Sequence, residues 1–491
     1  MAGLTGMGRD SDWSGVHAVV AGIGVSGFAA ADALLGLGAR VTVVEGRAGA
    51  TETERAAVLE ALGARVRLGV GESLPDGADV VVTSPGWRPQ APLFAAARAV
   101  GLPIWGEVEL AWRLRPTSGA AAWLAVTGTN GKTTTVRMLT AMLTAAGLRA
   151  VAAGNVGTPL LEVVMAEPRY DVLAVELSSF QLHWSTSLAM HSAAVLNVAP
   201  DHVDWHGDVD SYAAAKGVIY RGVQVACVYN VADPRTEDLV RAAEVTEGAR
   251  AIGFTLGAPG PGQLGVVEDL LVDRAFGSTD RGTAIELATV ADVVPAAPHN
   301  VENALAAAAL ARAFGVPAEA VRNGLRAFRP DAHRIAEVGM REGVRWVDDS
   351  KATNPHAAAA SLRAYDRVVW IAGGLAKGAT FDELVAGSAQ RLRAVVLIGA
   401  DRADIARALA RHAPDVPVIE VGATDTGAMD LVVAQAARIA QAGDTVLLAP
   451  ACASMDMFNS YAERGDRFAA AVLRLPGVKG AVDERGQRAH P

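Results

Sequence analysis

Two segments of this chain each combine a buried strand, a glycine-rich loop and a helix, and this repetition constrains the fold most strongly. The segments are HAVVAGIGVSGFAAADALLGLG (17–38) and AAWLAVTGTNGKTTTVRMLTAMLTAAG (121–147). Strand, tight turn and helix in succession are the repeating unit of a parallel α/β sheet. Further strand-like stretches follow along the chain: YDVLAVELSS, HSAAVLNVAP, DRVVWIAGG, AVVLIGA and DTVLLAP. The sequence therefore predicts an α/β protein.

The length of 491 residues corresponds to roughly three domains. Changes in pattern near residues 110 and 330 suggest the seams. We predict a Rossmann-like domain at 14–110, a central P-loop ATPase-like parallel sheet at 111–330, and a second Rossmann-like domain at 331–491. Residues 1–13 and 477–491 are polar and glycine-containing, which favours loose tails, with Lys479 a solvated charge.

Composition narrows the class of protein. A net charge of −9 argues against a general nucleic-acid binder. The two cysteines, Cys227 and Cys452, offer neither a disulfide framework nor a metal-binding spacing, which fits a reducing cytoplasm. The apolar stretch at 16–31 follows acidic residues and is interrupted by glycines, unlike an export signal. We expect a cytoplasmic monomer with no nucleic-acid or membrane partner, and Cys452 as a small core residue.

The first glycine loop has the spacing of a dinucleotide-binding fingerprint. Gly22, Gly24 and Gly27 follow a strand and precede a helix, and Glu45 ends the next strand. Such glycines let the backbone approach a pyrophosphate at a helix N-terminus. Taken alone, the loop suggests NAD or FAD and a nicotinamide-dependent oxidoreductase. A strand-turn-helix that merely needs small residues is the other interpretation.

The second glycine loop, TGTNGKTT (127–134), is the stronger signal. Backbone N–H groups from Gly128 to Gly131 can hold phosphates, Lys132 can reach the terminal phosphates, and the Thr133 hydroxyl can bind Mg²⁺. Val126 stands where the strict Walker pattern has glycine. Two phosphate loops in one chain indicate either two nucleotides or one nucleotide and a nucleotide-linked substrate.

Acidic and imidazole side chains follow other predicted strands. Glu176 comes at a strand end, where it could bind Mg²⁺, and Asp201 and His202 follow the next strand. Asn155 lies in GNVGTP, a sequence that predicts a turn, and either closes the turn or touches ligand. An exposed loop carboxylate and a structural histidine are the plainer interpretations of these residues.

Lysine is scarce in this chain, since only five of its 44 basic residues are lysines. Arginine is permanently charged, whereas a lysine amine can lose its proton and react. A lysine in this chain therefore marks a position where the chemistry could need a reactive amine, which an arginine does not provide. Lys132 lies in the phosphate loop, Lys216 lies in a predicted helix (SYAAAKGVIY), and two others follow strands of the third domain: Lys351 in VDDSKATNP and Lys377 in GGLAKG.

Seven motifs occur in an order that resembles the Mur ligases of peptidoglycan synthesis. They are TGTNGKTT, VELSSFQL, NVAPDHVDWH with the later AAAK, HNVENALAA, AHR, DDSKATNP and PACASMDMF…RGDRF. The resemblance covers residues 15–475, and DDSKATNP and PACAS discriminate best within the family. It implies three domains that bind, in turn, the uridine diphosphate of the substrate, ATP with Mg²⁺, and an amino acid.

Within the family, the resemblance is to the enzyme that adds D-glutamate to UDP-N-acetylmuramoyl-L-alanine at the expense of ATP. The implied reaction passes through an acyl phosphate in the cytoplasm. Another family ligase with a different amino acid or acceptor remains an alternative, as does the oxidoreductase.

The resemblance also implies roles for individual residues. The uridine diphosphate substrate is expected at Gly22, Gly24, Val25, Ser26, Gly27, Glu45, Arg47, Ser84 and Gly86. ATP is expected at Gly128, Thr129, Asn130, Gly131, Lys132, Thr133, Thr134, Asn155, Asn300, Arg334 and Asp349. D-Glutamate is expected at Thr353, Lys377, Ser454 and Tyr461.

The implied catalytic residues are Lys132, Glu176, His202, Lys216 and Lys351. Two Mg²⁺ ions are expected, one at Thr133 and Glu176 and one at His202 and Lys216. The resemblance implies that CO₂ converts Lys216 to a carbamate, which an arginine cannot form. His202 is also a candidate base for the amine of D-glutamate, although not while it binds metal. GGLAKG lacks an acid that many members carry beside Lys377.

Overall fold

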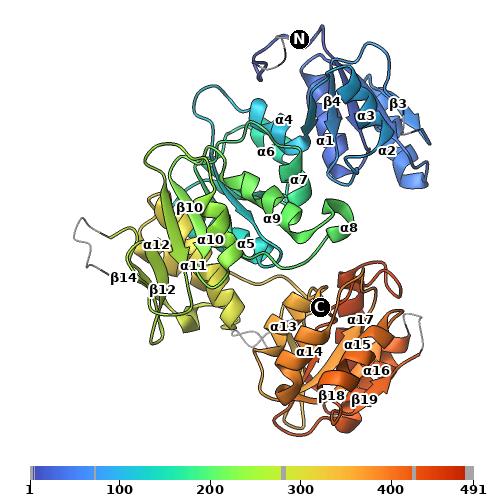
Figure 1. Cartoon of the computed structure of the whole chain (residues 1–491), viewed down its shortest axis with the longest axis vertical. Helices are drawn as coiled ribbons and strands as arrows, with labels where there is room; N and C mark the ends of the chain where they lie inside the picture. The colour runs from blue at the N-terminus through green and yellow to red at the C-terminus, as the bar shows by residue number, and fades with distance from the viewer. Residues whose placement is uncertain (1–3, 5, 71–72, 278–283, 423–426, 481–491) are drawn as a thin grey trace. The chain divides into compact units, whose positions relative to one another are not determined.

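A computed structural model describes residues 4, 6–70, 73–277, 284–422 and 427–480 (Figure 1). The chain divides into two compact units. One comprises Met1–Val198, His202–Val293 and Val301–Phe328, and the other comprises Ala199–Asp201, Val294–Asn300 and Arg329–Pro491. Three largely parallel sheets lie within them, which confirms the predicted multi-domain α/β architecture.

The first sheet is Rossmann-like, with five parallel strands in the order β3-β2-β1-β4-β5. Its elements are β1 (His17–Ala21), α1 (Val25–Gly36), β2 (Arg40–Glu45), α2 (Ala50–Ala61), β3 (Arg65–Leu68), β4 (Val80–Thr83), α3 (Pro92–Ala99), β5 (Ile104–Gly106) and α4 (Glu107–Arg113). Strand β1 is buried along its whole length, as expected for an apolar strand at the centre of a covered parallel sheet.

The segment before β1 is not the loose tail that its polar composition suggested. The Trp13 side chain is fully buried in the core, and its Nε1 donates to the Gly8 carbonyl at 3.0 Å. The large apolar surface of one indole outweighs the polar residues around it. Residues 1–3 and 5 lie outside the described residues.

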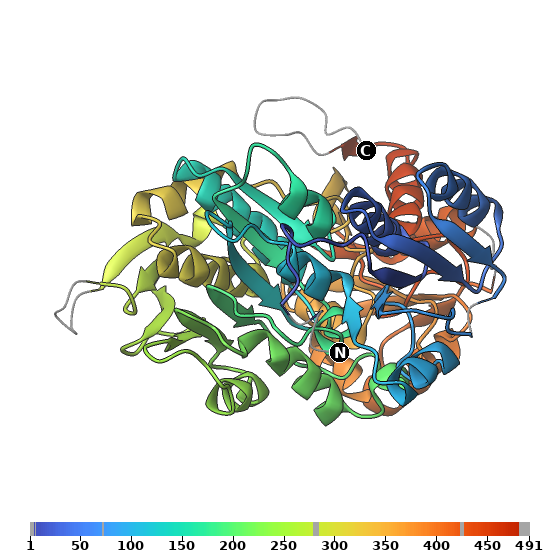
Figure 2. The ribbon, with the colours of Figure 1, turned by 90° about the horizontal axis from the view of Figure 1, so that it is seen from above.

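The central sheet has nine strands in the order β14-β13-β12-β11-β10-β9-β6-β8-β7. Its strands are β6 (Ala122–Thr127), β7 (Ala150–Gly154), β8 (Val172–Glu176), β9 (Ser192–Val195), β10 (Ala226–Asn230), β11 (Arg250–Phe254), β12 (Gln263–Val267), β13 (Leu270–Asp273) and β14 (Ile285–Thr289). Antiparallel pairing joins β12, β13 and β14 at one end of the sheet, where Figure 2 shows them in yellow-green.

The helices of this region are α5 (Lys132–Ala145), α6 (Leu160–Met165), α7 (Ser179–His183), α8 (Val203–His206), α9 (Val209–Gly217), α10 (Pro234–Arg241), α11 (Pro298–Ala313) and α12 (Ala318–Ala327), with 3-10 turns η1 (Val218–Tyr220) and η2 (Val290–Asp292). Strand β6 pairs in parallel with both β8 and β9, and β7 pairs in parallel with β8. The carboxyl ends of these four strands therefore meet at one edge, where an open α/β sheet binds ligands.

The third sheet has seven strands in the order β19-β18-β17-β20-β16-β15-β21. Its elements are β15 (Ala336–Arg341), β16 (Val344–Asp348), α13 (Pro355–Leu362), β17 (Val368–Gly373), α14 (Asp382–Ser388), η3 (Ala389–Arg391), β18 (Leu392–Ile398), α15 (Arg402–His412), β19 (Val418–Glu420), α16 (Ala428–Ile439), β20 (Thr445–Leu448), α17 (Tyr461–Leu473) and β21 (Lys479–Gly480). Strands β16 to β20 of this set run parallel.

The C-terminal segment differs from the frayed tail that the sequence suggested. Lys479 is exposed as predicted, but Lys479 and Gly480 form β21, which pairs antiparallel with β15 at Met340 and Gly339. Edge strand β15 offers free backbone groups to which any extended segment can add. The remainder of the predicted tail, 481–491, lies outside the described residues.

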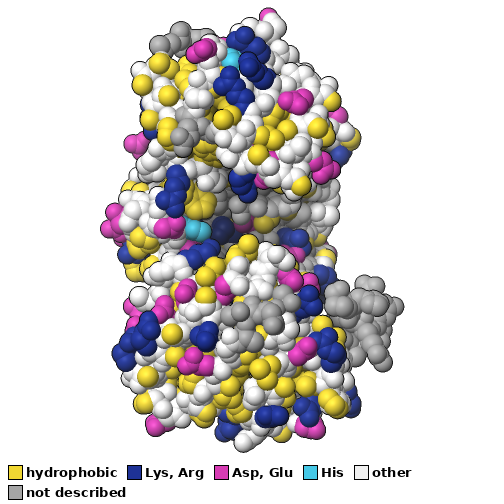
Figure 3. Space-filling view, turned by 90° about the vertical axis from the view of Figure 1, so that its right-hand side faces the viewer, with side chains coloured by type: hydrophobic (Ala, Val, Ile, Leu, Met, Phe, Trp, Pro, Cys, Tyr) yellow, Lys and Arg dark blue, Asp and Glu magenta, His cyan; other side chains and the backbone are white. Residues whose placement is uncertain are grey.

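Within the described ranges, none of the helices combines the length and apolar character needed to cross a membrane. On the face that Figure 3 shows, basic and acidic side chains are interspersed among hydrophobic ones.

Candidate active site

The loop between β6 and α5 has a backbone that only glycine accommodates at two positions. Gly128 has a φ of 154° and Gly131 a φ of 84°. A Cβ atom on Gly131 would also lie 2.2 Å from Asn303 Oδ1 of α11. The first bond of α5 joins the Thr135 N–H to the Gly131 carbonyl at 2.9 Å. The N–H groups just before it lack intrahelical acceptors, which suits a bound phosphate.

Asn197, just past β9, fixes the shape of this loop. Its Oδ1 accepts from the Asn130 N–H at 2.9 Å and its Nδ2 donates to the Asn130 carbonyl at 3.2 Å. Its own carbonyl accepts from the Thr129 N–H at 3.0 Å. The N–H groups of Thr129 and Asn130 therefore already have acceptors, so these two of the predicted donors from Gly128 to Gly131 hold the shape of the loop.

Two of the five lysines meet at the Gly128 carbonyl. Lys132 Nζ donates to it at 3.0 Å and to the Thr129 carbonyl at 2.9 Å. Lys216 Nζ donates to the same Gly128 oxygen at 2.9 Å, although helix α9 is far away in sequence. Lys216 is only 1% exposed, and its amine lies 4.3 Å from the ring centroid of Tyr212. The Tyr212 hydroxyl lies 3.2 Å from Thr129 Oγ1.

Glu176, at the end of β8, has one carboxylate oxygen occupied and one left over. Its Oε1 accepts from Asn155 Nδ2 at 2.9 Å. Its Oε2 is buried and has no hydrogen-bond partner among the described residues. A buried carboxylate oxygen beside a phosphate loop is a fitting ligand for Mg²⁺, since burial without a partner is costly.

No group of three or more His, Cys, Asp and Glu side chains in the described chain could hold a metal ion by itself. A cation here would need other oxygen donors, such as the Thr133 hydroxyl and phosphate oxygens, as Mg²⁺ commonly does.

His202 precedes helix α8 in the left-handed backbone region, with a φ of 52°, and its side chain is exposed. Its ring lies edge-on to Phe180, with centroids 4.8 Å apart, and 6.2 Å from Tyr212. Nearby His206 is different, because its Nε2 bonds Ser179 Oγ at 2.9 Å. Burial, with the charges of His183, His202 and Lys216, lowers the pKa of His206 to about 4, so it is neutral at pH 7.

The first glycine loop packs tightly against β4. Gly22 has a φ of 100°, and a Cβ atom on Gly27 would lie 2.0 Å from the Gly22 carbonyl oxygen. Ser84 lies against Gly22, and its Oγ is buried without a partner among the described residues. That hydroxyl is a candidate contact for a ligand held by the loop.

Glu45 braces this loop from β2. Its Oε2 accepts from the Ile23 N–H at 3.1 Å and its Oε1 from the Arg47 N–H at 3.0 Å. The carboxylate is therefore engaged by one backbone N–H of the glycine loop and one of the segment that follows β2. The other predicted residues of this loop, among them Val25 (61% exposed) and the exposed Gly86, stand at its surface.

In the second unit, paired carboxylates follow β16. Asp348 accepts from His333 Nδ1 at 2.6 Å and from the Ser350 N–H at 2.9 Å. The hydrogen bond with Asp348 raises the pKa of His333. Asp349 accepts from the Ser361 hydroxyl and from the Ile335 N–H at 3.3 Å. Burial raises the pKa of Asp349 to about 6, although its hydrogen bonds oppose the shift.

Arg464 of α17 joins two of the predicted motifs. It is 1% exposed, its Nη2 and Nε donate to the carbonyl and hydroxyl of Ser350 at 2.9 Å each, and its Nη1 donates to the Cys452 carbonyl at 3.1 Å. Cys452 itself is fully buried, which confirms its prediction as a core residue.

The predicted D-glutamate residues lie on loops that follow β16, β17 and β20. Lys351 Nζ lies 3.7 Å from the ring centroid of Tyr461, and Ser454 is buried. Lys377 is exposed with a φ of 51°. Close by, Asp401 Oδ2 accepts from the Ala376 N–H at 2.8 Å, so an acid from the next loop lies near the lysine that lacks one in its own motif.

The structure therefore groups the predicted residues into three sets. The uridine-nucleotide set lies on the first sheet, and Gly128–Thr134, Asn155, Glu176, His202 and Lys216 lie on the central sheet. Asn300, Arg334, Asp349, Lys351, Thr353, Lys377, Ser454 and Tyr461 belong to the second unit.

Sequence reasoning missed four residues that hold these loops: Asn197, Tyr212, Asn303 and Arg464. Asn197 follows a predicted strand, so the rule that selected Glu176 could have found it. The other three lie inside helices. Asn303 and Arg464 fall in the motifs HNVENALAA and RGDRF, and Tyr212 lies in SYAAAKGVIY, but the sequence does not show which loops they contact.

Comparison with known families agrees with this geometry. The Mur ligase middle domain matches residues 126–311, and the Mur ligase glutamate ligase domain matches residues 333–452. A UDP-N-acetylmuramoylalanine–D-glutamate ligase from Streptomyces avermitilis is 68% identical over 95% of this chain and 99% of its own length. The chain belongs to the Mur ligase family.

Other Mur ligases extend the comparison. The UDP-N-acetylmuramoylalanine–D-glutamate ligase of Mycolicibacterium smegmatis is 48% identical over 94% of this chain and 97% of its own length. Among solved structures, UDP-N-acetylmuramate–alanine ligase MurC from Thermotoga maritima has a TM-score of 0.53 at 19% identity, covering 93% of this chain and 98% of its own. A pseudomurein peptide ligase type C from Methanothermus fervidus has a TM-score of 0.55 at 17% identity, covering 94% and 100%. These structural likenesses concern the fold.

Proposed function

We propose that this chain joins D-glutamate to UDP-N-acetylmuramoyl-L-alanine with the cleavage of ATP to ADP and phosphate, in peptidoglycan precursor synthesis. The observation that carries the proposal is the phosphate loop 127–134 with a buried, unpartnered carboxylate oxygen of Glu176 at the same sheet edge. The substrate assignment follows from relatives that carry this activity in their names over nearly the full chain. The oxidoreductase alternative is set aside because the chain is a Mur ligase.

The domains would divide the work along the predicted boundaries. Residues 14–110 would hold the uridine diphosphate on the loop of Gly22 to Gly27, with the buried Ser84 hydroxyl as an added donor. Residues 111–330 would hold ATP, and residues 331–491 would hold D-glutamate near Thr353, Lys377, Ser454 and Tyr461. Asn300, Arg334 and Asp349 would complete the nucleotide site.

The Thr133 hydroxyl and the Glu176 Oε2 atom would hold a Mg²⁺ ion, whose charge would offset that of the phosphates during transfer of the γ-phosphoryl group. A second ion would lie near His202 and Lys216. We propose a carbamate on Lys216, formed when its neutral amine attacks CO₂ and releases a proton. A carbamate keeps one N–H, so the bond to the Gly128 carbonyl would survive, while its oxygens would supply the negative charge that a cation needs.

The residues of this chain would act mainly by placing the reactants. Lys132 would leave the Gly128 and Thr129 carbonyls to meet the terminal phosphates. The L-alanyl carboxylate would attack the γ-phosphorus, and ADP would leave. The amine of D-glutamate would then attack the acyl phosphate carbonyl and expel phosphate. Lys377 would hold a D-glutamate carboxylate by charge, and Lys351 would act on the ATP side of the site.

We propose that the enzyme acts as a monomer in the cytoplasm, since every predicted motif comes from one chain and its nucleotide-linked substrate is a soluble precursor. Light scattering at assay concentration would test the first part.

The test of function is phosphate release from ATP with UDP-N-acetylmuramoyl-L-alanine, Mg²⁺ and a panel of amino acids. We expect release with D-glutamate and none with L-glutamate. Lys132→Ala should abolish release, whereas Lys479→Ala, an exposed lysine on β21, should leave it unchanged. Release with another amino acid alone would overturn the substrate, and silence across the panel would overturn the ligase activity.

A further inference from the structure

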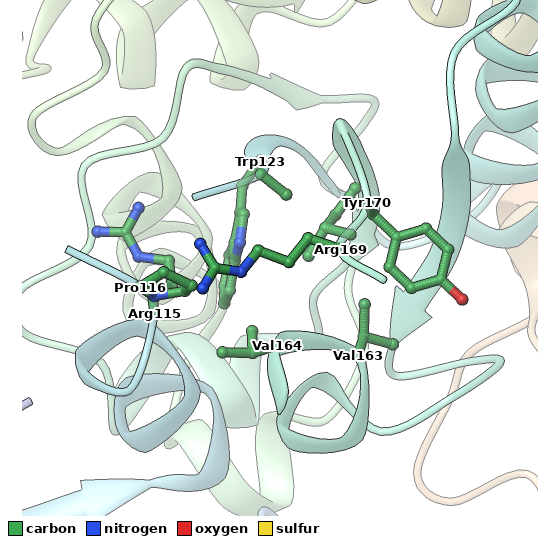
Figure 4. A pocket seen from close by; sticks show the side chains of 9 residues that line it. Arg115, Pro116, Trp123, Val163, Val164, Arg169 and Tyr170 are labelled. Carbon is green, nitrogen blue, oxygen red and sulfur yellow. The ribbon is translucent and has the colours of Figure 1, made fainter. Parts of the chain in front are cut away.

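A small pocket lies at the amino ends of β6 and β8, away from the phosphate loop (Figure 4). It is lined by Arg115, Pro116, Ala121, Trp123, Val163, Val164, Arg169, Tyr170 and Leu173. Trp123 is the second residue of β6, and the phosphate loop follows the last. At about 3.3 Å per strand residue, the two places are roughly 13 Å apart along the strand. The pocket is therefore separate from the candidate active site.

One hydrogen-bond donor in the pocket wall has no acceptor. The Trp123 side chain is 1% exposed, and its Nε1 is buried without a hydrogen-bond partner among the described residues. A buried N–H without an acceptor destabilises the folded state. The indole therefore presents a donor that a ligand could satisfy.

One cation in the wall also lacks a counter-charge. Arg115 Nε donates to the Trp112 carbonyl at 2.9 Å, and its guanidinium stacks over the Trp112 ring. Arg115 forms no ion pair with any carboxylate in the described part of the chain. Burial lowers the pKa of its guanidinium to about 10, so the group is still charged at neutral pH.

The second arginine of the pocket is already neutralised. Arg169 lies at the exposed rim, where its Nε donates to Glu167 at 3.1 Å and its Nη1 to the Ser118 carbonyl at 3.1 Å. The pocket thus holds one uncompensated positive charge. Its remaining walls are apolar side chains, which exclude water and strengthen an ionic contact.

We propose that this pocket binds a short-chain monocarboxylate. The carboxylate would accept from Trp123 Nε1 and pair with the Arg115 guanidinium, and its short alkyl group would lie against Val163, Val164 and Leu173. A monoanion matches the single free charge, whereas a dianionic phosphate would bring a second, buried and unpaired charge. The pocket is small, so only a ligand of few heavy atoms could enter it.

Such a ligand would contact the segments that connect the first sheet to the central sheet. The pocket is formed by the chain after α4, by α6 and by the start of β8, and Glu107 of α4 accepts from the Leu161 N–H of α6 at 3.2 Å. Binding would therefore stabilise the connection between the first and central sheets.

The test is titration of the full-length protein with sodium acetate against sodium chloride at equal ionic strength. We expect acetate alone to raise the melting temperature, and saturation-transfer NMR of acetate to give a Kd of about millimolar, since four heavy atoms supply little binding energy. Trp123→Phe keeps the apolar ring and removes the donor, and it should weaken acetate at least about tenfold. Arg115→Met should do the same.

Arg169→Gln is the matched control, because it removes a lining arginine that is already paired, and it should change acetate affinity less than about threefold. Equal shifts with acetate and chloride would overturn the site. So would unchanged acetate affinity in Arg115→Met, which remains informative if Trp123→Phe fails to fold. Tighter binding of inorganic phosphate than of acetate would overturn the monocarboxylate class.

Discussion

At the residue scale, Lys216 carries the most distinctive chemistry, because its amine is buried with the Gly128 carbonyl as an acceptor and an aromatic face beside it. A guanidinium could keep that hydrogen bond and the positive charge, but it cannot form a carbamate. We therefore expect Lys216→Arg to lower kcat at least about a hundredfold, since it removes a ligand of the phosphoryl-transfer site.

Phosphate release would measure this, with Lys479→Arg as the control that should behave like the wild type. Depleting CO₂ from the buffer should lower wild-type activity, and bicarbonate should restore it. Full activity in folded Lys216→Arg would rule out the carbamate.

Glu176 allows a second prediction, because function and stability should respond in opposite directions. Glu176→Gln keeps the shape and the contact with Asn155 while it removes the charge. We expect the Mg²⁺ concentration for half-maximal activity to rise at least about tenfold. The free energy of unfolding without Mg²⁺ should rise by about 1 kcal/mol, because a buried negative charge that has no ion-pair partner among the described residues is removed. Urea melts and Mg²⁺ titrations would measure the two effects, and a variant that loses stability with unchanged Mg²⁺ demand would contradict the metal role.

At the element scale, α5 and α11 fix the phosphate loop through one glycine. Gly131→Ala would place a Cβ atom 2.2 Å from Asn303 Oδ1 and force alanine into a φ of 84°. Gly147→Ala, at the other end of α5, has a similar φ of 81° but meets nothing within 4 Å. We expect Gly147→Ala to cost about 1–2 kcal/mol through backbone strain alone.

Gly131→Ala should cost more in unfolding free energy than this control, by about 1–3 kcal/mol from overpacking, and should lose nucleotide affinity as well. Chemical denaturation and binding of a nonhydrolysable ATP analogue would measure these losses. Equal stability losses in both variants would show that the Asn303 side chain moves aside at no cost in stability.

The connection between α4 and α6 should respond to pH. Burial raises the pKa of Glu107 from 4.5 to about 7, although its bond from the Leu161 N–H opposes the shift. Between these values the folded state binds more protons than the unfolded state, so stability falls as pH rises from 4.5 to 7. Glu107→Gln should therefore gain stability over the wild type with rising pH, by at most about 3 kcal/mol above pH 7.

Urea melts at pH 5 and pH 8 would measure that gain. Glu60→Gln, an exposed glutamate on α2, should show no such trend. A gain for Glu107→Gln that is equal at both pH values would contradict ionisation of the buried carboxyl.

Much of this architecture could be predicted because its signals are local. Strand-loop-helix repeats predicted the α/β sheets, and the rule that ligands bind at strand carboxyl ends selected Glu176 and the loop of Lys351. The supports could not be predicted in the same way. Trp13 is buried although the residues around it in the sequence are polar. Arg464 bonds to Cys452 and also to Ser350, which lies more than a hundred residues away in the sequence. Such contacts depend on the tertiary fold, which no short pattern records.

At the scale of the whole molecule, the predicted nucleotide loop and the buried Arg464 belong to different units. Proteins with several compact units often unfold in more than one transition. We expect calorimetry to show at least two transitions. Mg²⁺ with a nonhydrolysable ATP analogue should raise the melting temperature of the transition that belongs to the unit with the phosphate loop. The stabilisation follows mass action, about 2.7 kcal/mol when the ligand is at a hundred times its Kd.

Arg464→Ala provides the opposite probe, because it removes three hydrogen bonds and leaves the Ser350 and Cys452 carbonyls without their donor. We expect it to lower the free energy of unfolding of the second unit by about 3–5 kcal/mol, as for other broken buried charge contacts. The first unit should change little. Arg467→Ala, an exposed arginine on the same helix, should change neither transition, since its Glu463 contact at 3.6 Å is a surface ion pair. One transition that moves as a whole with both the nucleotide and Arg464→Ala would instead mean that the two units unfold as one cooperative body, so that loss of Arg464 would reach the phosphate loop through stability alone.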